Sequence, residues 1–495
     1  MRLRDLLAGA DVIEVSGDAD AEVTSLAYDS RRVQPGGLFF CVPGHVVDGH
    51  DFAAFAIQAG AESLVVERAL EVPAYVIQVR VRDARAAMAL AAARFSGDPT
   101  EELRVAGITG TNGKTTTAFL VRHILESERR PCGLLGTVKR VIGGAEQPVE
   151  RTTPEAIELQ ATFRAMLDAG DEACVMEVSS HALALRRALG VRFAVATFTN
   201  LTQDHLDFHP DVEAYFQAKR RLFVTGVAEH AAINADDEYG RRLLAEVDAL
   251  SFSASGGAEA DLRAVDVGFD ALGSRFGLLW REGRVEVETR LPGLFNVENS
   301  LAAIATVSLL GVPVDRAAAA LRTAPRVPGR FEPIDEGQGF GVLVDYAHTP
   351  DSLDNVLRSA RALTERRLIA VFGAGGDRDR AKRPLMGAIG ARLADIAIVT
   401  SDNPRSEDPE RIVDELLAGA EEIDSPGVLR SVIDRAEAIS EALTMARPGD
   451  TVVIAGKGHE QGQEFAGGHK VPFDDREVAR QELRRIAGGA LHSAR

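Results

Sequence analysis

One glycine-rich run constrains the fold of this chain more than any other feature: Gly-Ile-Thr-Gly-Thr-Asn-Gly-Lys-Thr-Thr-Thr, from Gly107 to Thr117. A short apolar segment precedes it, and apolar residues at helical spacing follow it. Such a loop between a strand and a helix lets backbone N–H groups and the helix N-terminus surround a phosphate group. Lys114 would reach the terminal phosphates of a nucleotide, and the Thr115 hydroxyl would hold Mg²⁺. We predict a phosphate loop, although Ile108 stands where the general pattern has its first glycine; the alternative is a flexible strand-to-helix turn.

Composition limits the remaining possibilities. A length of 495 residues predicts about three domains. The net charge of −18 argues against a nucleic-acid partner, because phosphate backbones require a basic face. The three cysteines are scattered without metal-ligand spacing, which indicates a reducing compartment. We find no signal-peptide pattern and no apolar stretch long enough to span a membrane, so we expect a cytoplasmic protein with no membrane partner.

The fold class that the pattern predicts is α/β in three domains, with boundaries after residues 98 and 329. Breaker-rich stretches at 96–99 and 325–333 mark these boundaries. We expect a small α/β domain at 1–98, a central ATPase-like, mostly parallel sheet at 99–329, and a Rossmann-like α/β domain at 330–495. Strands are predicted at 173–178, 193–198, 231–234, 343–345, 368–372, 396–400 and 452–455, with extra strands within 251–291 and helices at 84–95 and 300–310.

Candidate catalytic side chains follow two strands of the central domain. Glu177 ends one predicted strand, and His205 lies in the polar segment after the next. Both could join a magnesium shell on bound phosphates, because hard cations prefer oxygen ligands and successive strand ends converge. Lys219 lies in a helical pattern beside Arg220 and Arg221. It either belongs to a solvated helix face or has a lowered pKa, in which case it can take up CO₂ as a carbamate that binds metal.

Three polar or glycine-rich loops follow strands of the last domain, at 373–379, 401–405 and 455–460. Arg378 and Arg405 could each grip a carboxylate with two parallel hydrogen bonds, and Glu460 could hold an ammonium group. A zwitterionic amino acid offers both kinds of group. The sequence therefore predicts an amino-acid site at these strand ends.

Together these motifs resemble the Mur ligases of peptidoglycan synthesis over nearly the whole chain. The resemblance implies an ATP-dependent, amide-forming ligase. It would add meso-2,6-diaminopimelate to the D-glutamate γ-carboxylate of UDP-N-acetylmuramoyl-L-alanyl-D-glutamate through an acyl phosphate. It also implies a monomer, Mg²⁺ as a cofactor, and a first domain that binds the UDP end of the substrate.

The resemblance further implies roles for individual residues. ATP would be bound by Gly110, Thr111, Asn112, Gly113, Lys114, Thr115, Thr116, Asn296, Arg330 and Asp345; a structural cap is the alternative for Asp345. The nucleotide-sugar dipeptide would be bound by Tyr28, Ser30, Thr152, Thr153, Ser179 and Arg187. Diaminopimelate would be bound by Arg378, Asp402, Asn403, Pro404, Arg405, Gly456 and Glu460. The metal ligands would be Thr115, Glu177, His205 and carbamylated Lys219, and the catalytic residues Lys114, Lys219, Glu177 and His205.

Three alternatives remain open at this point. A lysine-adding homologue is disfavoured because Asp-Asn-Pro-Arg at 402–405 offers a guanidinium to a distal carboxylate that lysine lacks. A folylpolyglutamate synthetase shares the ATP loop but has no reason to carry this motif. A nucleotide-binding switch or scaffold is disfavoured because Lys114, Glu177, His205 and Lys219 occur together.

Overall fold

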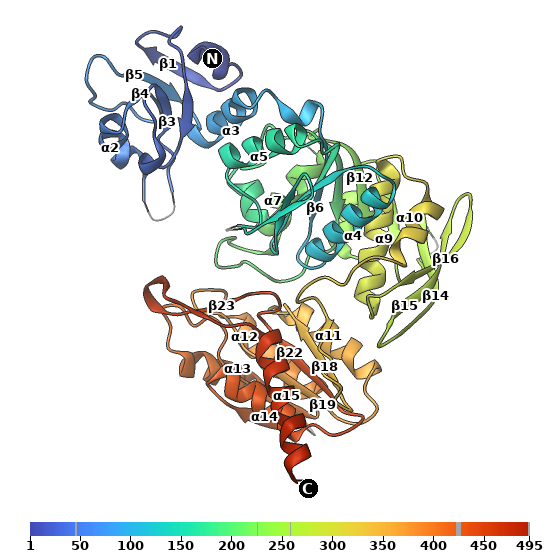
Figure 1. Ribbon diagram of the computed structural model, residues 1–495. Coiled ribbons are helices and arrows are strands. Elements are labelled where there is room, and N and C mark those ends of the chain that lie inside the picture. Colours follow the sequence, from blue (N-terminus) through green and yellow to red (C-terminus); the bar gives the residue numbers. More distant parts are fainter. Residues whose placement is uncertain (45–46, 150, 225, 258, 422–426, 494–495) are drawn as a thin grey trace. The chain divides into compact units, whose positions relative to one another are not determined.

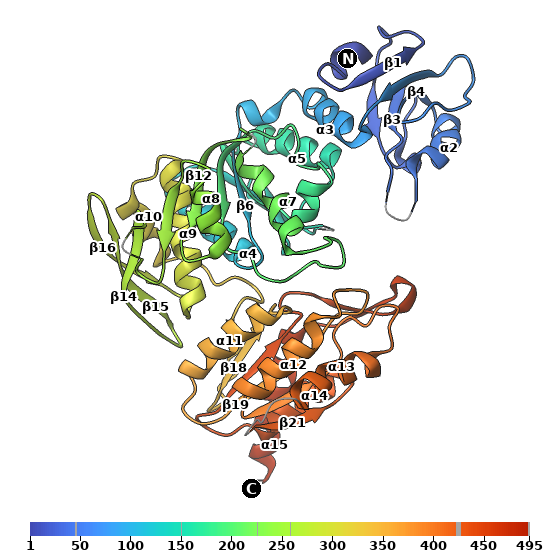
Figure 2. The same ribbon diagram turned by 180° about the vertical axis from the view of Figure 1, so that it is seen from behind.

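The computed structural model describes residues 1–44, 47–149, 151–224, 226–257, 259–421 and 427–493 (Figures 1 and 2). The chain forms two compact units. The first comprises 1–109, 129–196 and 218–230, and the second comprises 110–128, 197–217 and 231–495. Within the described ranges, no helix is both long and apolar enough to cross a membrane. The predicted domain boundaries at 98 and 329 stay a prediction.

The N-terminal part builds a five-stranded sheet in the order β1-β5-β4-β3-β2, in which only β1 runs antiparallel to its neighbour. Its elements are α1 (Leu3–Leu6), β1 (Val12–Ser16), β2 (Ser25–Ala27), β3 (Gly37–Phe40), α2 (Ala53–Gln58), β4 (Ala61–Val66), β5 (Ile77–Val81) and α3 (Ala84–Phe95). Side chains alternate across β3: Leu38 and Phe40 pack with α1 and α3, whereas Phe39 packs with α2. The helix predicted at 84–95 is confirmed, and Asp83 caps it.

The central part contributes an eleven-stranded sheet in the order β16-β15-β14-β13-β12-β11-β6-β10-β7-β8-β9. Its strands are β6 (Arg104–Thr109), β7 (Cys132–Leu135), β8 (Arg140–Ile142), β9 (Ala145–Gln147), β10 (Ala173–Glu177), β11 (Phe193–Phe198), β12 (Ala228–Asn234), β13 (Leu250–Ser253), β14 (Leu262–Asp270), β15 (Gly273–Trp280) and β16 (Gly283–Thr289). Its helices are α4 (Lys114–Ser127), α5 (Ala156–Asp168), α6 (Ser180–Ala184), α7 (Val212–Val224), α8 (Glu238–Leu244), α9 (Leu294–Leu309) and α10 (Val314–Leu321). β6 pairs in parallel with β10, and the strands predicted within 251–291 are present, β14 to β16 as an antiparallel meander.

One helix boundary in this part differs from the prediction. The helix expected at 300–310 begins at Leu294, because Gly293 adopts a φ of +101° and starts the helix there. Asn296, a predicted ATP-binding residue, lies inside the first turn and donates its amide to the carbonyl of Pro292. A side-chain bond to the backbone of the preceding turn therefore lets a poor helix former sit in this helix.

The C-terminal part is a six-stranded sheet in the order β17-β18-β22-β19-β20-β21, parallel except for β17, with a separate hairpin of β23 and β24. Its strands are β17 (Glu332–Pro333), β18 (Gly341–Asp345), β19 (Leu368–Phe372), β20 (Ile396–Val399), β21 (Val428–Ser431), β22 (Thr451–Ala455), β23 (Gly462–Glu464) and β24 (Lys470–Pro472). Its helices are α11 (Pro350–Ala362), α12 (Lys382–Leu393), α13 (Pro409–Glu421), α14 (Arg435–Met445) and α15 (Asp475–Ser493).

Helices cover both faces of this sheet. Ala370 and Phe372 of β19 pack with α11, α12 and α13, whereas Ile369 and Val371 pack with α14 and α15. Because both faces are buried, the four inner strands β18, β19, β20 and β22 read as continuous apolar runs, which is why they were predictable. The loops after β18, β19, β20 and β22 all leave the sheet at the edge formed by the carboxyl ends of these parallel strands.

Candidate active site

The phosphate loop joins β6 to α4 and is braced by the segment after β11. The backbone N–H of Thr111 donates to the carbonyl of Asn200 at 2.9 Å, and that of Asn112 donates to the Asn200 side chain at 2.8 Å. The Thr199 hydroxyl donates to the Asn112 carbonyl at 2.6 Å. Gly110 has a φ of +152°, and a Cβ there would lie 1.9 Å from the Thr199 hydroxyl oxygen. Only glycine fits this position, so the loop has one defined shape.

The side chains of the first two residues of α4 contact the phosphate loop and the segment between α10 and β17. Lys114 donates from Nζ to the carbonyls of Gly110 at 2.9 Å and Thr111 at 2.7 Å. The Thr115 hydroxyl accepts a hydrogen bond of 2.9 Å from Arg330, whose guanidinium lies 4.4 Å from the ring centre of Tyr346. Two predicted ATP-binding residues, Lys114 and Thr115, therefore open α4, and the side chain of a third, Arg330, reaches the same helix start. Gly113, with a φ of +85°, caps that helix, and Thr116 is buried in its first turn.

Asp345, at the end of β18, is bonded on both carboxylate oxygens. The N–H of Phe331 donates to Oδ2 at 2.6 Å and the N–H of Ala347 donates to Oδ1 at 2.7 Å. Burial raises the pKa of Asp345 to about 6, and the opposing effects of Arg330 and these two bonds are smaller. The side chain thus holds the backbone at Phe331 against the end of β18, which agrees with the structural role given above as the alternative for Asp345. Its contact with ATP stays a prediction.

Glu177 ends β10 and is 1 % exposed. Its Oε1 accepts from the Thr137 backbone N–H at 2.7 Å and its Oε2 from the Thr137 hydroxyl at 3.1 Å. The same hydroxyl lies 3.1 Å from that of Thr152, a predicted substrate contact. The first unit therefore holds a buried carboxylate next to a row of hydroxyl groups.

His205 and Lys219 differ in how far the structure supports their predicted roles. His205 adopts a φ of +57°, and its Nε2 lies 3.4 Å from the carboxylate of buried Asp204. Burial acts to raise the pKa of Asp204, but the positive charges of His205, His348 and Lys382 outweigh it and hold that pKa well below its usual range. Lys219 on α7 is 1 % exposed, so the alternative of a solvated helix face is wrong.

The metal site itself stays a prediction. The described residues contain no group of three or more His, Cys, Asp or Glu that could hold a metal ion. The predicted ligand set includes only two residues of these types, Glu177 and His205, so this absence does not bear on it. Carbamylation of Lys219 also stays a prediction.

Three of the predicted nucleotide-sugar residues, Thr153, Ser179 and Arg187, form a connected cluster in the first unit. The Thr153 hydroxyl donates to the Glu177 carbonyl at 2.9 Å and accepts from the Ser179 N–H at 3.1 Å. Arg187 donates to the Thr153 carbonyl at 3.3 Å and pairs with Glu155 at 2.8 Å. Burial lowers the pKa of Arg187 despite this carboxylate. Glu155 was not predicted from the sequence.

Tyr28 and Ser30 lie in the N-terminal part of the same unit. The Tyr28 hydroxyl donates to Glu158 at 3.2 Å, and burial together with the charge of Glu158 raises the pKa of Tyr28 to about 12. Ser30 begins the short 3₁₀ turn Ser30–Arg32, which Asp29 caps. Both residues are half-buried.

The predicted amino-acid residues gather at the carboxyl ends of β20 and β22. Asp402 and Asn403 are buried, and Asn403 donates to Glu460 at 2.9 Å. Lys457, which is 0 % exposed, donates to Asp402 at 3.3 Å, Asn403 at 2.8 Å and Glu460 at 3.2 Å. Lys457 was not among the predicted site residues. The signal for it was the scarcity of lysine, since only six of the 56 basic residues are lysines.

The two predicted carboxylate-binding arginines are placed differently. Arg405 has a φ of +50°, and its guanidinium donates to the Gly376 carbonyl at 2.7 Å and to Glu464 at 3.2 Å. Arg378 is about half exposed, with a side-chain exposed fraction of 48 %, and donates to the carbonyl of Asp377. Arg405 is thus held by its neighbours. The remaining predicted residues are Pro404, which is buried, and Gly456, which has a φ of +123° and lies next to Asp402.

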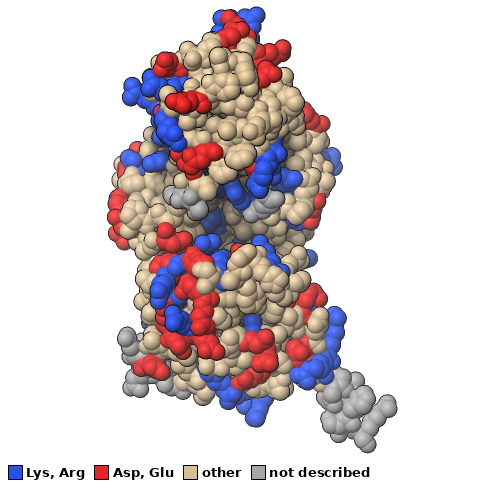
Figure 3. All heavy atoms as spheres, turned by 90° about the vertical axis from the view of Figure 1, so that its left-hand side faces the viewer, with Lys and Arg blue, Asp and Glu red and all other residues tan. Residues whose placement is uncertain are grey.

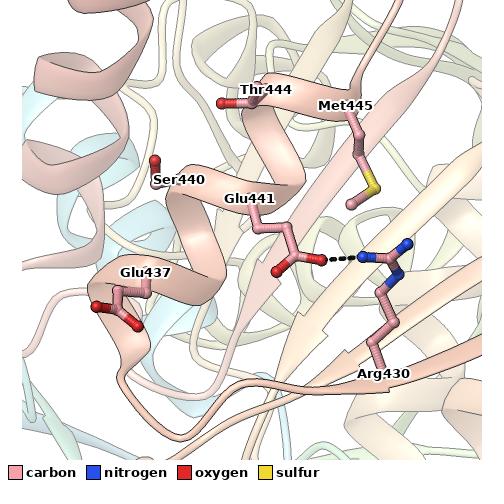
Figure 4. Close-up of a pocket in the computed structure, with 6 residues that line it drawn as sticks. All are labelled: Arg430, Glu437, Ser440, Glu441, Thr444 and Met445. Atoms are coloured by element: carbon pink, nitrogen blue, oxygen red, sulfur yellow. Dashed lines mark hydrogen bonds and ion pairs between the residues drawn. The ribbon is translucent and has the colours of Figure 1, made fainter.

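One surface hollow lies away from these loops, along α14. Figure 4 shows Arg430, Glu437, Ser440, Glu441, Thr444 and Met445 around a volume of about 480 Å³. Arg430 pairs with Glu441 across it, and both side chains are substantially exposed. This is an open surface feature, and acidic and basic side chains are likewise interspersed over the face shown in Figure 3.

Three family descriptions match consecutive parts of the chain. "Mur ligase family, catalytic domain" matches 22–96, "Mur ligase middle domain" matches 108–307, and "Mur ligase, glutamate ligase domain" matches 329–458. The chain belongs to the Mur ligase family. Membership confirms the predicted resemblance, the α/β fold class and the enzyme class, an ATP-dependent amide-forming ligase.

Several relatives are similar over almost their full length. The protein of Alkaliphilus metalliredigens named UDP-N-acetylmuramoyl-L-alanyl-D-glutamate--2,6-diaminopimelate ligase is 43 % identical to this chain. The match covers 97 % of this chain and 98 % of the relative. Proteins of the same name from Geobacter sulfurreducens and Streptomyces coelicolor are each 46 % identical to this chain. Both matches cover 97 % of this chain, with 98 % of the first relative and 96 % of the second.

Solved structures agree with the fold. A structure of the same named ligase is 32 % identical with a TM-score of 0.70, covering 98 % of this chain and 99 % of the other. A folylpolyglutamate synthase of Mycobacterium tuberculosis complexed with ADP and AMPPCP is 19 % identical with a TM-score of 0.60, covering 75 % and 92 %. The latter likeness shows the fold alone, so fold does not separate these two ligases.

Proposed function

We propose that this Mur ligase joins meso-2,6-diaminopimelate to the D-glutamate γ-carboxylate of UDP-N-acetylmuramoyl-L-alanyl-D-glutamate, with ATP as the energy source, in peptidoglycan synthesis. The observation that carries the proposal is the identity of 43–46 % over 97 % of the chain to ligases named for this reaction. Because this similarity includes all three family regions, it covers the residues proposed to bind all three substrates.

The phosphate loop supports the proposed phosphoryl transfer. The N–H groups of 110–113 and the N-terminus of α4 favour negative charge, and Lys114 can move from the loop carbonyls to the terminal phosphates of ATP. Phosphoryl transfer to the glutamate carboxylate needs little covalent help from a protein, so positioning and charge stabilisation supply most of the rate. The amine of the incoming amino acid then attacks the carbonyl carbon of the acyl phosphate, inorganic phosphate leaves, and an amide forms.

Mg²⁺ fits the donors that the chain offers. The Thr115 hydroxyl and the Glu177 carboxylate are oxygen ligands, the type that Mg²⁺ prefers, and we propose them as its protein ligands together with His205 and carbamylated Lys219. Burial of Lys219 supports the carbamate, since desolvation favours the neutral amine that reacts with CO₂. When bound, Mg²⁺ would neutralise phosphate charge.

The cluster around Thr153 supports the acceptor assignment. Ser179 and Arg187 are held on the same threonine, and Arg187 keeps its charge next to Glu155. A fixed hydroxyl and a fixed guanidinium suit the sugar-dipeptide, which carries both hydroxyl groups and carboxylates. Tyr28 and Ser30 are proposed to contact its uridine end.

The loop with Arg405 supports diaminopimelate over lysine. Its guanidinium is anchored through Nε and Nη1, which leaves Nη2 as a donor for a ligand carboxylate. Lysine has no distal carboxylate and would leave this donor unpaired, which disfavours it. Glu460 offers an oxygen to an ammonium group at the same strand ends.

An ATP-dependent ligation assay tests the proposal. The purified protein is given the UDP-linked dipeptide with diaminopimelate and lysine in competition, and folate with glutamate in a separate arm. We expect phosphate release and a tripeptide product containing diaminopimelate. A product containing lysine or polyglutamylated folate would replace the proposal, and no phosphate release with any acceptor would favour the switch or scaffold.

The proposal includes a cytoplasmic location and a monomeric state. The location rests on the absence of a signal-peptide pattern and on the scattered cysteines, and the monomeric state rests on the resemblance to the family. Light scattering of the purified protein and fractionation of expressing cells would test them.

A further inference from the structure

The side chain of Lys457 is a buried cation surrounded by predicted amino-acid-binding residues. It lies two residues after the end of β22 and is 0 % exposed. Its ammonium group donates to three different side chains: Asp402 at 3.3 Å, Asn403 at 2.8 Å and Glu460 at 3.2 Å. Two of these acceptors are carboxylates, so loss of this lysine would remove the cation that both of them contact.

Lys457 also fixes which way the Asn403 amide points. Asn403 Oδ1 accepts from Lys457 Nζ and, at 3.0 Å, from the backbone N–H of Glu464. Both of these groups are donors only, so the amide oxygen must face them. Nδ2 is then directed at Glu460 Oε2, at 2.9 Å.

As a result, the two oxygens of the Glu460 carboxylate have different hydrogen-bond partners. Oε2 accepts from both Lys457 and Asn403. Oε1 accepts from the Tyr346 hydroxyl at the long distance of 3.5 Å, and the side chain is 32 % exposed. One oxygen is therefore used to hold the carboxylate in place, and the other stays accessible to a ligand.

We propose that Lys457 is the positioning residue of the amino-acid site, which fixes Glu460 so that its Oε1 receives an ammonium group of the incoming amino acid. This inference rests on the proposed function, because it requires that an amino acid binds at this site. Lys457 does not touch the substrate in this arrangement, and it acts through Glu460 and Asn403.

The buried carboxylate of Asp402 supports this role. Burial acts to raise the pKa of Asp402, but the charges of Lys457 and Arg435 outweigh it, so the pKa lies below its usual value. Asp402 is therefore ionised, and with Glu460 it places two negative charges on one ammonium group. Replacing that ammonium with an uncharged side chain would let the carboxylates repel each other and turn Glu460 away.

Kinetic constants for each substrate separate positioning from general damage. The wild-type protein is first assayed with a panel of amino acids that includes diaminopimelate and lysine. Lys457→Met is then measured with the amino acid that the wild type prefers. Because a charge-assisted hydrogen bond is lost, we expect KM for that amino acid to rise at least about tenfold. KM for ATP and for the UDP-linked acceptor should change less than about twofold.

Two further variants keep the test decisive. Arg430→Met is the matched control, since it removes a cation from the exposed pair with Glu441 and should leave all three KM values unchanged. If Lys457→Met does not fold, Lys457→Met/Asp402→Asn restores the balance of buried charge and should still show the raised KM for the amino acid. Adding Glu460→Gln to Lys457→Met should cost less than the product of the two separate effects, because both act on one group.

The two proposals fail in different ways. A wild type that prefers an amino acid other than diaminopimelate overturns the proposed substrate and leaves the Lys457 test intact on the preferred one. An unchanged KM for the amino acid in Lys457→Met, or equal rises for all three substrates, overturns the positioning role. A wild type that joins no amino acid overturns both.

Discussion

Arg383 on α12 offers a quantitative test of how the amino-acid loops are held. Its buried guanidinium donates to both oxygens of Glu407, at 2.8 and 2.9 Å, to Glu415 on α13 at 2.8 Å, and to the Gly375 carbonyl at 3.2 Å. It thus ties two strand-end loops to two helices. Arg383→Met keeps most of the apolar contact and removes all four bonds.

The size of the effect follows from Glu407. The hydrogen bonds from Arg383 are the largest cause that lowers the pKa of Glu407, from 4.5 to about 2. At about 1.4 kcal/mol per unit, a shift of this size corresponds to roughly 3 kcal/mol at neutral pH. Glu407 is 24 % exposed, and Asp377 and Arg380 also contribute, so we expect the variant to lose about 2 kcal/mol.

Hydrogen exchange measures this loss locally, which suits a chain of several parts that need not unfold in one step. Peptides from α13 should exchange about 30-fold faster in Arg383→Met than in the wild type at pH 7, which is the factor that 2 kcal/mol gives. Arg380→Met is the matched control. It removes an exposed bond to the same Glu415 and should change exchange by less than about threefold.

The pH dependence gives the sign. The folded-state pKa of Glu407 is depressed, so its contribution is present above the unfolded value of about 4.5 and is lost as the pH falls toward 2. The difference between variant and wild type should therefore shrink by more than half between pH 7 and pH 3. A difference that stays constant over this range, or a control that matches the variant, would refute the reasoning.

Four further changes test the catalytic parts. Lys114→Met should lower kcat by at least about a thousandfold in phosphate-release assays, because the variant lacks the cation that stabilises the negative charge of the transferred phosphoryl group. Gly110→Ala should abolish ATP binding in calorimetry, since its Cβ would overlap the Thr199 hydroxyl. Lys219→Met should remove turnover and a carbamate signal in ¹³CO₂ NMR; full activity would exclude the carbamate. Arg405→Ala should raise KM for diaminopimelate at least about tenfold and leave KM for ATP unchanged, and equal changes in both would contradict its specificity role.

Strand ends were predictable because the four inner strands of the C-terminal sheet, β18, β19, β20 and β22, are buried on both faces. The apolar run of β19 stops at Phe372, and the next residues are glycines and charged side chains. Such a change in pattern locates the loop without knowledge of its neighbours. The start of α9 was not predictable in this way, since Asn296 favours a loop until its bond to Pro292 is known.

The sequence pattern could not predict which charged side chains are buried or which residues they contact. Lys219 and Lys457 each lie among charged or polar neighbours in the sequence, and both are almost fully buried. Glu155 follows the predicted Thr152 and Thr153, but its pairing with Arg187 joins residues separated by more than a whole helix. Pattern identifies the residue types, whereas the three-dimensional fold decides which charge meets which.

The choice between the two basic residues nevertheless follows a rule visible in this molecule. Arg383 and Arg435 each meet one carboxylate through two parallel bonds, and Arg435 holds Asp475 with two bonds of 2.7 Å. A planar guanidinium fits such a pair, whereas a tetrahedral ammonium can direct its three donors at three separate acceptors, as Lys457 does. In a chain that uses arginine for 50 of its 56 basic residues, Lys457 therefore occupies a site where several acceptors converge. Lys457→Arg tests this rule directly: it keeps the charge, and we expect it to raise KM for the amino acid almost as much as Lys457→Met. Recovery of the wild-type KM would show that charge alone is required at this position.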